Sequence, residues 1–278
     1  MMNITIQNEF ASVTCRTLGA ELLSYKTAAG KEYMWQKDPA YWAKTSPVLF
    51  PYIGAVPETV TIHGVDYKIP RHGFVKDAEF EVAEKGDDYV ILSTGTNDYT
   101  TSVYPYDFRF TVTFRLDQAK LVVTYGVENK SDKEMPFLIG GHPAFFCPLH
   151  EGEKQSEYCL GFRNGQGKVP EALVNTVFGE GGVVTTQKKE YKLYENLKAR
   201  TVKLISSRTE KGIQFDFPGY ESVAFWTPIK KDAPFLCIEP WCGGTIDQVS
   251  CTDMLQKKYV QYLSAGQARD YVFAFKPC

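Results

Sequence analysis

Apolar and polar residues alternate along much of the chain, with a period of two far more often than three or four. The segment Phe108–Leu116 alternates without interruption, a short polar stretch follows, and Leu121–Val127 resumes the alternation. Because successive side chains of a strand point to opposite faces, this pattern predicts a β-hairpin. Alternation also predicts strands at Ala11–Arg16, Tyr89–Thr94 and Asp270–Phe275.

Helical periodicity is weak, and only Pro39–Lys44 and Ser250–Gln256 indicate short helices. The 22 glycines and 15 prolines interrupt short apolar runs, and aromatic residues make up 14% of the chain. This composition favours antiparallel sheets over helices. No low-complexity linker or repeat divides the strand pattern, so the sequence predicts one all-β sandwich domain spanning residues 1–278.

The charge pattern argues against several classes of partner. The 31 basic and 33 acidic residues are intermixed and give a net charge of −2, so no overall field favours nucleic acid or an anionic membrane. The N-terminus lacks the pattern of a signal peptide, and no apolar run approaches the ~20 residues that span a bilayer. We therefore expect a cytoplasmic monomer or homodimer that binds a small neutral molecule.

One carboxylate lies within an otherwise apolar segment. Glu239 follows Phe235–Ile238 and precedes Pro240 and Trp241. Glutamate is almost never fully buried without a partner. Glu239 is therefore expected to be paired, to have a shifted pKa, or to act as a base.

Two of the four histidines stand where the backbone is restricted. His72 follows Pro70 and Arg71 and precedes a glycine, and His142 lies between Gly141 and a proline. Each histidine alone is also explained as a polar group beside a turn. Together with the carboxylate, the two imidazoles form a set that can supply a general base and a general acid.

In this order, the segments around these residues resemble the motifs of the aldose 1-epimerase (galactose mutarotase) family, most of all its shorter bacterial branch. The motifs are Arg71–Phe74, Gly141–Phe145 and Cys237–Trp241, and further similarity at 18–24, 46–54 and 127–131 extends the resemblance over most of the chain. The resemblance implies the family's single large antiparallel β-supersandwich, with a sugar bound in an open cleft on one face.

The resemblance also implies an activity, the interconversion of the α and β anomers of an aldohexose. Opening the ring requires removal of a proton from the C1 hydroxyl while the ring oxygen is protonated. The family likeness assigns the base to Glu239 and the acid to His142, on opposite sides of C1, with His72 hydrogen-bonding near the ring oxygen. Because mutarotation proceeds unaided in water, neither a metal nor any other cofactor is expected.

Aromatic residues near these motifs suit a sugar, because the C–H faces of a pyranose pack on flat rings. Each of them is also explained as an ordinary core residue. The candidates for substrate binding are Phe74, Phe145, Trp226 and Trp241, together with Arg71.

Two features of the family's substrate recognition have no match here. The segment Phe50–Gly54 is followed by Ala-Val-Pro, where relatives carry a basic residue that Arg71 would only partly replace. No residue matches the substrate-orienting aspartate, because Glu195 and Asp216 stand in a different sequence context. The identity of the sugar therefore stays open, and a hexose-6-phosphate mutarotase is an alternative.

Three other functions stay open. The chain could be a catalytically weak carbohydrate-binding protein on the same fold, because folds host many functions. A glycoside hydrolase would need a second carboxylate, for which Asp247 is the nearest candidate. Finally, His72, His142 and Glu239 could form a metal site of two histidines and one carboxylate.

Overall fold

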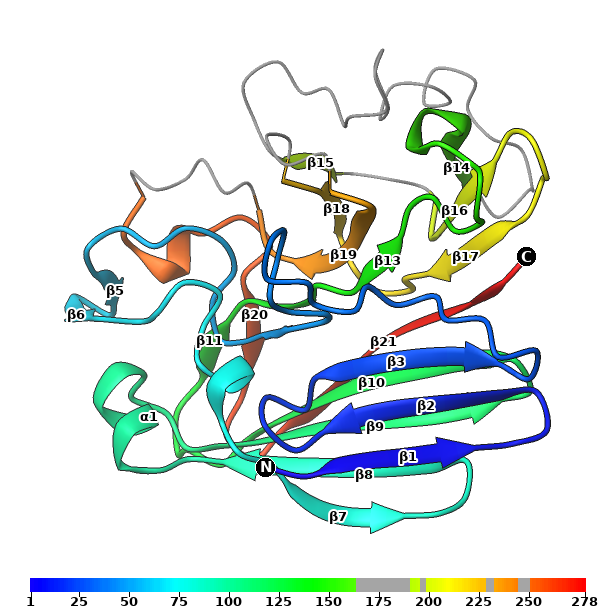
Figure 1. Cartoon of the computed structure of the whole chain (residues 1–278). Coiled ribbons are helices and arrows are strands. Elements are labelled where there is room, and N and C mark those ends of the chain that lie inside the picture. Colours follow the sequence, from blue (N-terminus) through cyan, green and yellow to red (C-terminus); the bar gives the residue numbers. More distant parts are fainter. Residues whose placement is uncertain (164–190, 196–198, 229–232, 245–250) are drawn as a thin grey trace.

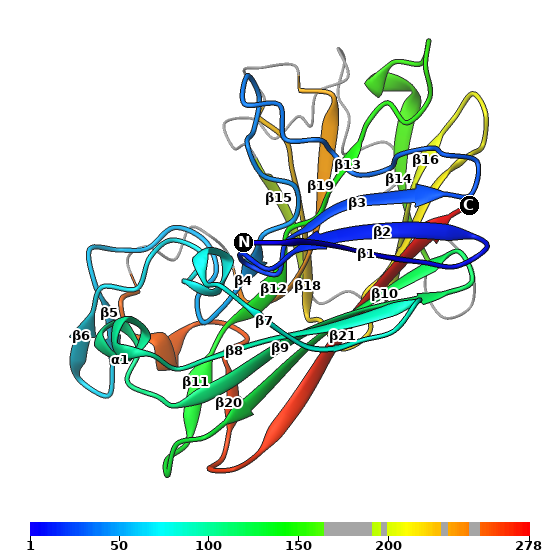
Figure 2. The same cartoon turned by 60° about the horizontal axis from the view of Figure 1, so that its bottom comes forward.

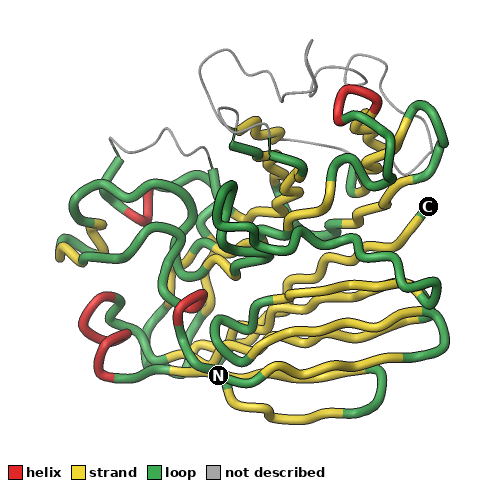
Figure 3. The backbone as a smooth tube through the Cα atoms, in the orientation of Figure 1, coloured by secondary structure: helices red, strands yellow, loops and turns green. Residues whose placement is uncertain are grey.

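The computed structural model describes residues 1–163, 191–195, 199–228, 233–244 and 251–278. These residues form mostly strands, with a few short helical turns (Figures 1 and 3). The pairings between the strands are antiparallel, and the large sheets lie over one another. The predicted all-β, antiparallel fold class is therefore confirmed.

The largest sheet has eight strands and includes the predicted hairpin. Its order is β14 (Tyr158–Arg163), β16 (Thr201–Ser206), β17 (Gly212–Asp216), β21 (Ala268–Pro277), β10 (Lys120–Asn129), β9 (Phe108–Asp117), β8 (Tyr89–Gly95) and β7 (Glu81–Lys85). In the hairpin, Lys120 pairs with Asp117 and Asn129 with Phe108. Burial alternates along both hairpin strands, as the apolar pattern predicts.

A three-stranded sheet lies over the region of β8, β9 and β10 (Figures 1 and 2). It consists of β1 (Asn3–Gln7), β2 (Ala11–Arg16) and β3 (Leu22–Thr27). Apolar side chains of this sheet, among them Ile6 and Val13, belong to the same core as Val90 and Phe110 of the large sheet. This part of the main core therefore fills the space between these two sheets.

The sheet that carries the candidate site is built around β19 (Phe235–Cys242), all eight residues of which are buried. Its order is β15 (Tyr191–Glu195), β18 (Ser222–Trp226), β19, β12 (Ile139–Gly141) and β4 (Val48–Leu49), and β13 (Ala144–Phe146) also pairs with β19. Along β19, Leu236 and Ile238 face the main core, whereas Phe235 and Cys237 join a second cluster. By strand alternation, Glu239 lies on the face of that second cluster.

The remaining elements are short. They are the hairpin β5 (Val60–Ile62) and β6 (Val65–Tyr67), the pair β11 (Met135–Phe137) and β20 (Gln261–Leu263), the helix α1 (Asp98–Val103), and the 3₁₀ turns η1 (Val75–Asp77), η2 (Gln155–Glu157) and η6 (Met254–Gln256). Within the described ranges, no helix is long and apolar enough to cross a membrane.

The predicted helix at Pro39–Lys44 is wrong, because this segment forms turns. The carbonyl of Trp42 accepts a hydrogen bond from the indole N–H of Trp35, at 2.9 Å, instead of one from a following helical turn. Of the helix predicted at Ser250–Gln256, only the single turn η6 forms, and residue 250 lies outside the described residues.

Candidate active site

His142 and Glu239 meet because of the register of the central sheet. β12 and β13 pair with β19 on either side of a short break that holds His142 and Pro143, and the register is the same before and after it. His142 therefore stands opposite Glu239. The N–H of Ile238 donates to the carbonyl of Pro143, at 3.0 Å, which fixes the break against β19. As a result, Nε2 of His142 lies 3.2 Å from Oε2 of Glu239.

Burial determines the ionisation of this pair. Glu239 is 1% exposed and His142 is 8% exposed, so water stabilises the charged form of neither. Burial raises the pKa of Glu239 well above its ordinary value, against the opposing effects of Arg71 and Trp241. Burial lowers the pKa of His142, and the positive charge of Arg71 adds to that shift. Both shifts favour a neutral carboxyl and a neutral imidazole.

His72 is held at the cavity by two docked loops. His72 and Gly73 have φ angles of 62° and 72°, and a Cβ on Gly73 would lie 1.9 Å from the carbonyl oxygen of Phe50. The N–H of Gly54 donates to Nδ1 of His72, at 3.1 Å. Burial and neighbouring positive charges lower the pKa of His72 well below its usual value. A neutral His72 that accepts at Nδ1 carries its proton on Nε2, which is then available to donate.

Three tryptophans gather around the pair. The ring of Trp42 lies 5.0 Å from that of His142, at 30°, and Trp226 lies 5.7 Å from it, at 73°. The ring of His72 stands perpendicular to His142 at 5.7 Å. Among the described residues, no acceptor forms a hydrogen bond of normal geometry with the buried indole N–H of Trp241. The N–H still lowers the pKa of Glu239, because it stabilises the ionised carboxylate.

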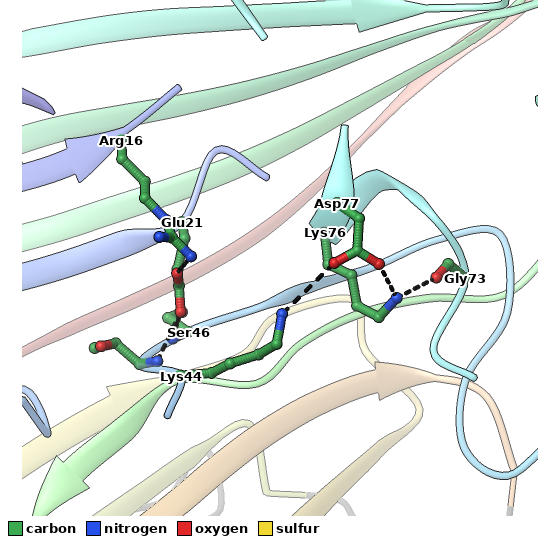
Figure 4. Close-up of polar contacts among 8 residues, drawn as sticks. Arg16, Glu21, Lys44, Ser46, Gly73, Lys76 and Asp77 are labelled. Carbon is green, nitrogen blue, oxygen red and sulfur yellow. Dashed lines mark hydrogen bonds and ion pairs between the residues drawn. The ribbon is translucent and has the colours of Figure 1, made fainter. Parts of the chain in front are cut away.

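The segment that carries Trp42 into the site is anchored by a buried carboxylate (Figure 4). Glu21, 3% exposed, accepts hydrogen bonds from the backbone N–H groups of Thr45, at 2.7 Å, and Ser46, at 3.2 Å. The same carboxylate pairs with Arg16. The contact joins the first strands of the chain to the edge of the site. It fixes the backbone between Trp42 and Lys44 on one side and Pro47 on the other, all of which line the cavity.

These side chains line a cavity of about 500 Å³. The lining consists of Trp42, Lys44, Pro47, Pro70, Arg71, His72, Lys76, His142, Trp226, Glu239 and Trp241. The structure thus brings together His72, His142 and Glu239 with three of the predicted binding residues, Arg71, Trp226 and Trp241. Sequence reasoning missed Trp42, Lys44 and Lys76, none of which lies within a motif that indicates chemistry by itself.

Two predicted binding residues lie elsewhere. Phe145 is fully buried and packs on Phe275 of the large sheet, at 5.0 Å between ring centres. Phe74 is 3% exposed and packs on Phe108, at 5.9 Å. Proximity in sequence to the histidines was misleading here. Phe145 lies in the strand β13, three residues from His142, so alternation directs it to the opposite side. Phe74 follows two residues with positive φ and itself has helical backbone angles, so strand alternation does not apply to it. Both phenylalanines therefore belong to the main core and line no part of the described cavity.

One group of potential metal ligands differs from the predicted one. Ligand atoms of His142, Cys237 and Glu239 lie within 4.8 Å of one another. Burial raises the pKa of the Cys237 thiol well above its usual value, and Glu239 adds to the shift. A thiol must lose its proton to bind a metal. The donor set is thus poorly suited to a metal at neutral pH.

The other carboxylates considered from the sequence are engaged or not described. Glu195 pairs with Lys258 at 2.6 Å, and Asp216 accepts a hydrogen bond from Thr201 at 2.7 Å. Neither lines the cavity. Asp247 lies outside the described residues, and Glu239 is the one acidic side chain among the described residues of the lining.

Comparison with known proteins identifies clear relatives. A family model described as aldose 1-epimerase matches residues 2–251. The chromosomal and plasmid forms of Protein LacX from Lactococcus lactis are each 33% identical over 268 residues, which cover 87% of this chain and 88% of LacX.

Two solved structures are similar over the whole chain. A galactose mutarotase related enzyme from Lactobacillus acidophilus has a TM-score of 0.85 at 26% identity, covering 100% of this chain and 97% of that chain. A galactose mutarotase-like protein from Lactobacillus casei has a TM-score of 0.84 at 26% identity, covering 100% of both chains. The architecture is therefore the galactose mutarotase-like fold predicted from the sequence motifs.

Proposed function

Because this chain belongs to the aldose 1-epimerase family, we propose that it is a mutarotase that interconverts the α and β anomers of an aldohexose. Family membership and the mutarotase-like relatives support a carbohydrate epimerase function. The observation that carries the finer proposal is the contact between His142 and Glu239, 3.2 Å apart in a cavity lined by three tryptophans.

In the proposed reaction, Glu239 removes the proton from the C1 hydroxyl while His142 protonates the ring oxygen. The ring opens, C1 rotates, and the two transfers reverse. The resemblance implied a base and an acid on opposite sides of C1. Because the two groups are in contact, we propose instead that both act on the same edge of the sugar. The C1 hydroxyl and the ring oxygen are bonded to the same carbon, so a single carboxylate–imidazole pair can reach both.

The ionisation of the pair suits this exchange. The pair has two states with the same number of protons. In one state the carboxyl and the imidazole are both neutral, and in the other they are a carboxylate and an imidazolium. Conversion between them moves one proton from the carboxyl of Glu239 to the imidazole of His142 and requires no exchange with solvent. The charge of Arg71 and the indole N–H of Trp241 favour the carboxylate, and hydroxyl donors of a bound sugar would act in the same direction.

The remaining residues of the lining have proposed roles in binding. Trp42, Trp226 and Trp241 offer flat apolar surface to the C–H faces of the sugar. His72, whose Nδ1 is held by Gly54, would donate from Nε2 to an oxygen near the ring oxygen. Arg71 would bind a polar substituent. A neutral His72 fits a positioning donor better than a second acid.

A catalytically weak carbohydrate-binding protein is the second candidate. It is favoured by the engagement of Glu195 with Lys258 and of Asp216 with Thr201, since neither carboxylate is then free to orient a sugar. A binding protein would use the same tryptophans and histidines without accelerating anomerisation.

Anomerisation measured by NMR or polarimetry separates the two. Freshly dissolved α-glucose and α-galactose, and their 6-phosphates, would be followed with and without the protein. We expect the protein to accelerate the approach to equilibrium of at least one sugar over buffer. Binding of these sugars without acceleration of any of them would contradict the mutarotase proposal and leave the binding protein.

A further inference from the structure

We propose that the sugar bound in this cavity carries an anionic substituent, a phosphate or a carboxylate, held by Lys44, Arg71 and Lys76. The inference rests on the proposed mutarotase function and names the class of its substrate. It assigns a role to two lysines that the sequence motifs did not indicate.

The first observation is the excess of positive charge around the cavity. Three cationic side chains, Lys44, Arg71 and Lys76, line it, and Glu239 is the one acidic group of the described lining. Burial favours the neutral form of that carboxyl, so it offers the cations little compensating charge. Lys44 and Lys76 have a counter-charge in Asp77, which is not part of the lining. Within the cavity, a neutral sugar would offer the three cations no charge, whereas an oxyanion would pair with them directly.

The second observation is that a single carboxylate already bridges the two lysines at the edge of the cavity (Figure 4). Asp77 lies with Oδ2 at 2.5 Å from Nζ of Lys76 and with Oδ1 at 3.6 Å from Nζ of Lys44. The two ammonium groups are thus spaced so that one oxyanion group can contact both. Asp77 is 61% exposed and Lys44 is 38% exposed, so the longer pair is a weak surface ion pair that a substrate oxyanion can displace.

The third observation is that the fold fixes the Lys76 ammonium and the backbone next to Lys44 before any sugar binds. Nζ of Lys76 donates to the carbonyl of Gly73, at 2.8 Å, within the turn that presents His72. Lys44 immediately precedes the segment anchored by Glu21. Side chains and segments that are already ordered lose less freedom on binding a ligand. The same two segments also deliver residues to the catalytic pair, so the charge and the chemistry are positioned together.

Arg71 lines the same cavity as the catalytic pair and the two lysines. Its positive charge affects the pKa of Glu239, His142 and His72, so the guanidinium lies within electrostatic reach of the reacting end. Glu239 is the one acidic residue that shares the described lining with it. A sugar whose anomeric carbon lies at the catalytic pair would extend its substituent past Arg71 toward the two lysines.

The test compares glucose, glucose 6-phosphate and glucuronate. For each sugar, kcat/KM for anomerisation would be measured by NMR, and affinity by calorimetry with Glu239→Gln, which should not turn over. We expect one of the two anionic sugars to be preferred over glucose by about tenfold or more, since charge-assisted hydrogen bonds to an oxyanion are strong. The preferred anion distinguishes a phosphate from a carboxylate. Equal values for charged and neutral sugars would overturn the proposal.

Variants of the lysines identify the residues responsible. In the double variant Lys44→Gln with Lys76→Gln, the preference for the anionic sugar should fall by about tenfold, and added salt should reduce the wild-type preference. Lys120→Gln is the matched control, because Lys120 pairs with Asp117 in the β9–β10 turn and does not line the cavity. An unchanged preference in the folded double variant would overturn the assignment.

A further variant tests the site without removing a cation. Asp77→Asn leaves both lysines in place and removes their competitor, so affinity for the anionic sugar should rise. A fall in that affinity would contradict the role given to Asp77.

The outcomes also separate this proposal from the mutarotase proposal. If the anionic sugar binds through the lysines but is not anomerised faster, the subsite stands and the mutarotase proposal fails. If only glucose is accelerated, the mutarotase proposal stands and the subsite fails.

Discussion

His142 stands opposite Glu239 in the antiparallel register that β12 and β13 share on β19, and its Nε2 lies 3.2 Å from the carboxylate. A break in the pairing at this point leaves both side chains facing the cavity and not locked into a continuous sheet. The backbone that creates the contact is buried on both sides. The geometry of the His142–Glu239 pair is therefore a property of the core of the sheet.

Replacement of His142 tests the role of the imidazole. His142→Asn keeps a polar side chain but cannot exchange a proton, so kcat should fall by about 10²–10⁴-fold with little change in affinity. NMR rates and calorimetric binding of the same sugar provide the two quantities. His63→Asn is the matched control, because His63 is an exposed turn residue outside the cavity. Equal losses of kcat and affinity in His142→Asn would indicate a binding role only.

The pH dependence of kcat/KM follows from the two pKa shifts. In the proposed mechanism, the His142–Glu239 pair holds one proton when it is active. With the pKa of Glu239 raised and that of His142 lowered, both by burial, a second proton binds only at low pH and the shared proton is lost only at high pH. We expect a plateau across neutral pH that falls on both sides. A maximum confined between the ordinary pKa values of glutamate and histidine would contradict these shifts.

Trp241→Phe should move the alkaline limb of that profile. The indole N–H favours the Glu239 carboxylate, so its removal raises the pKa of the carboxyl further and shifts the limb to higher pH. Trp226→Phe is the control, because Trp226 also lines the cavity but is not among the groups that shift the pKa of Glu239. An unchanged or lower alkaline pKa in Trp241→Phe would refute the effect of the indole on the pKa of Glu239.

Two glycines with similar backbones allow a matched test of the His72 turn. Gly73 and Gly152 have φ angles of 72° and 76°. Gly152→Ala meets no atom within 4 Å, so it should cost about 1–2 kcal/mol for the left-handed conformation alone. Gly73→Ala meets the carbonyl of Phe50, which should cost a further ~1–3 kcal/mol and displace His72. Chemical denaturation measures both, and equal costs would contradict the docked loops.

Chelation tests the metal alternative. Because burial keeps the Cys237 thiol protonated, we expect dialysis against EDTA to leave the anomerisation rate unchanged. The measurement is the rate before and after dialysis, with metal content determined in parallel. Loss of activity that returns when zinc is added would instead favour a metal site that includes His142 and Glu239.

The sequence predicted the parts of the fold that depend on local pattern. The β9–β10 hairpin follows from alternation on both sides of a short polar turn. The helix α1 was missed, although Asn97 and Thr100 form a capping box at its start; this signal is visible in the sequence but short. The helix expected at Pro39–Lys44 does not form. The indole of Trp35 donates a hydrogen bond to the carbonyl of Trp42, a contact that the local sequence pattern does not indicate. A single domain across 1–278 stays a prediction, as does the cytoplasmic location.

Within the candidate site, the motifs indicated the residues on restricted backbone and on β19. They did not indicate Trp42, Lys44 or Lys76, because these enter the cavity through long-range contacts such as the anchor at Glu21. Phe145 was misassigned because a motif gives proximity in sequence but not the direction of a side chain. Local pattern thus indicated the proposed acid and base, and only the fold showed the walls of the cavity.

The most direct test of the central claim is the anomerisation rate of Glu239→Gln, with Glu81→Gln, an exposed glutamate of β7, as the control. Glutamine keeps the shape of the side chain but cannot accept the hydroxyl proton. NMR exchange measurements on the preferred sugar should show the acceleration over buffer reduced by about 10²–10⁴-fold in Glu239→Gln, with sugar binding retained and the control unchanged. Acceleration by Glu239→Gln close to that of the wild type would contradict the assignment of Glu239 as the base.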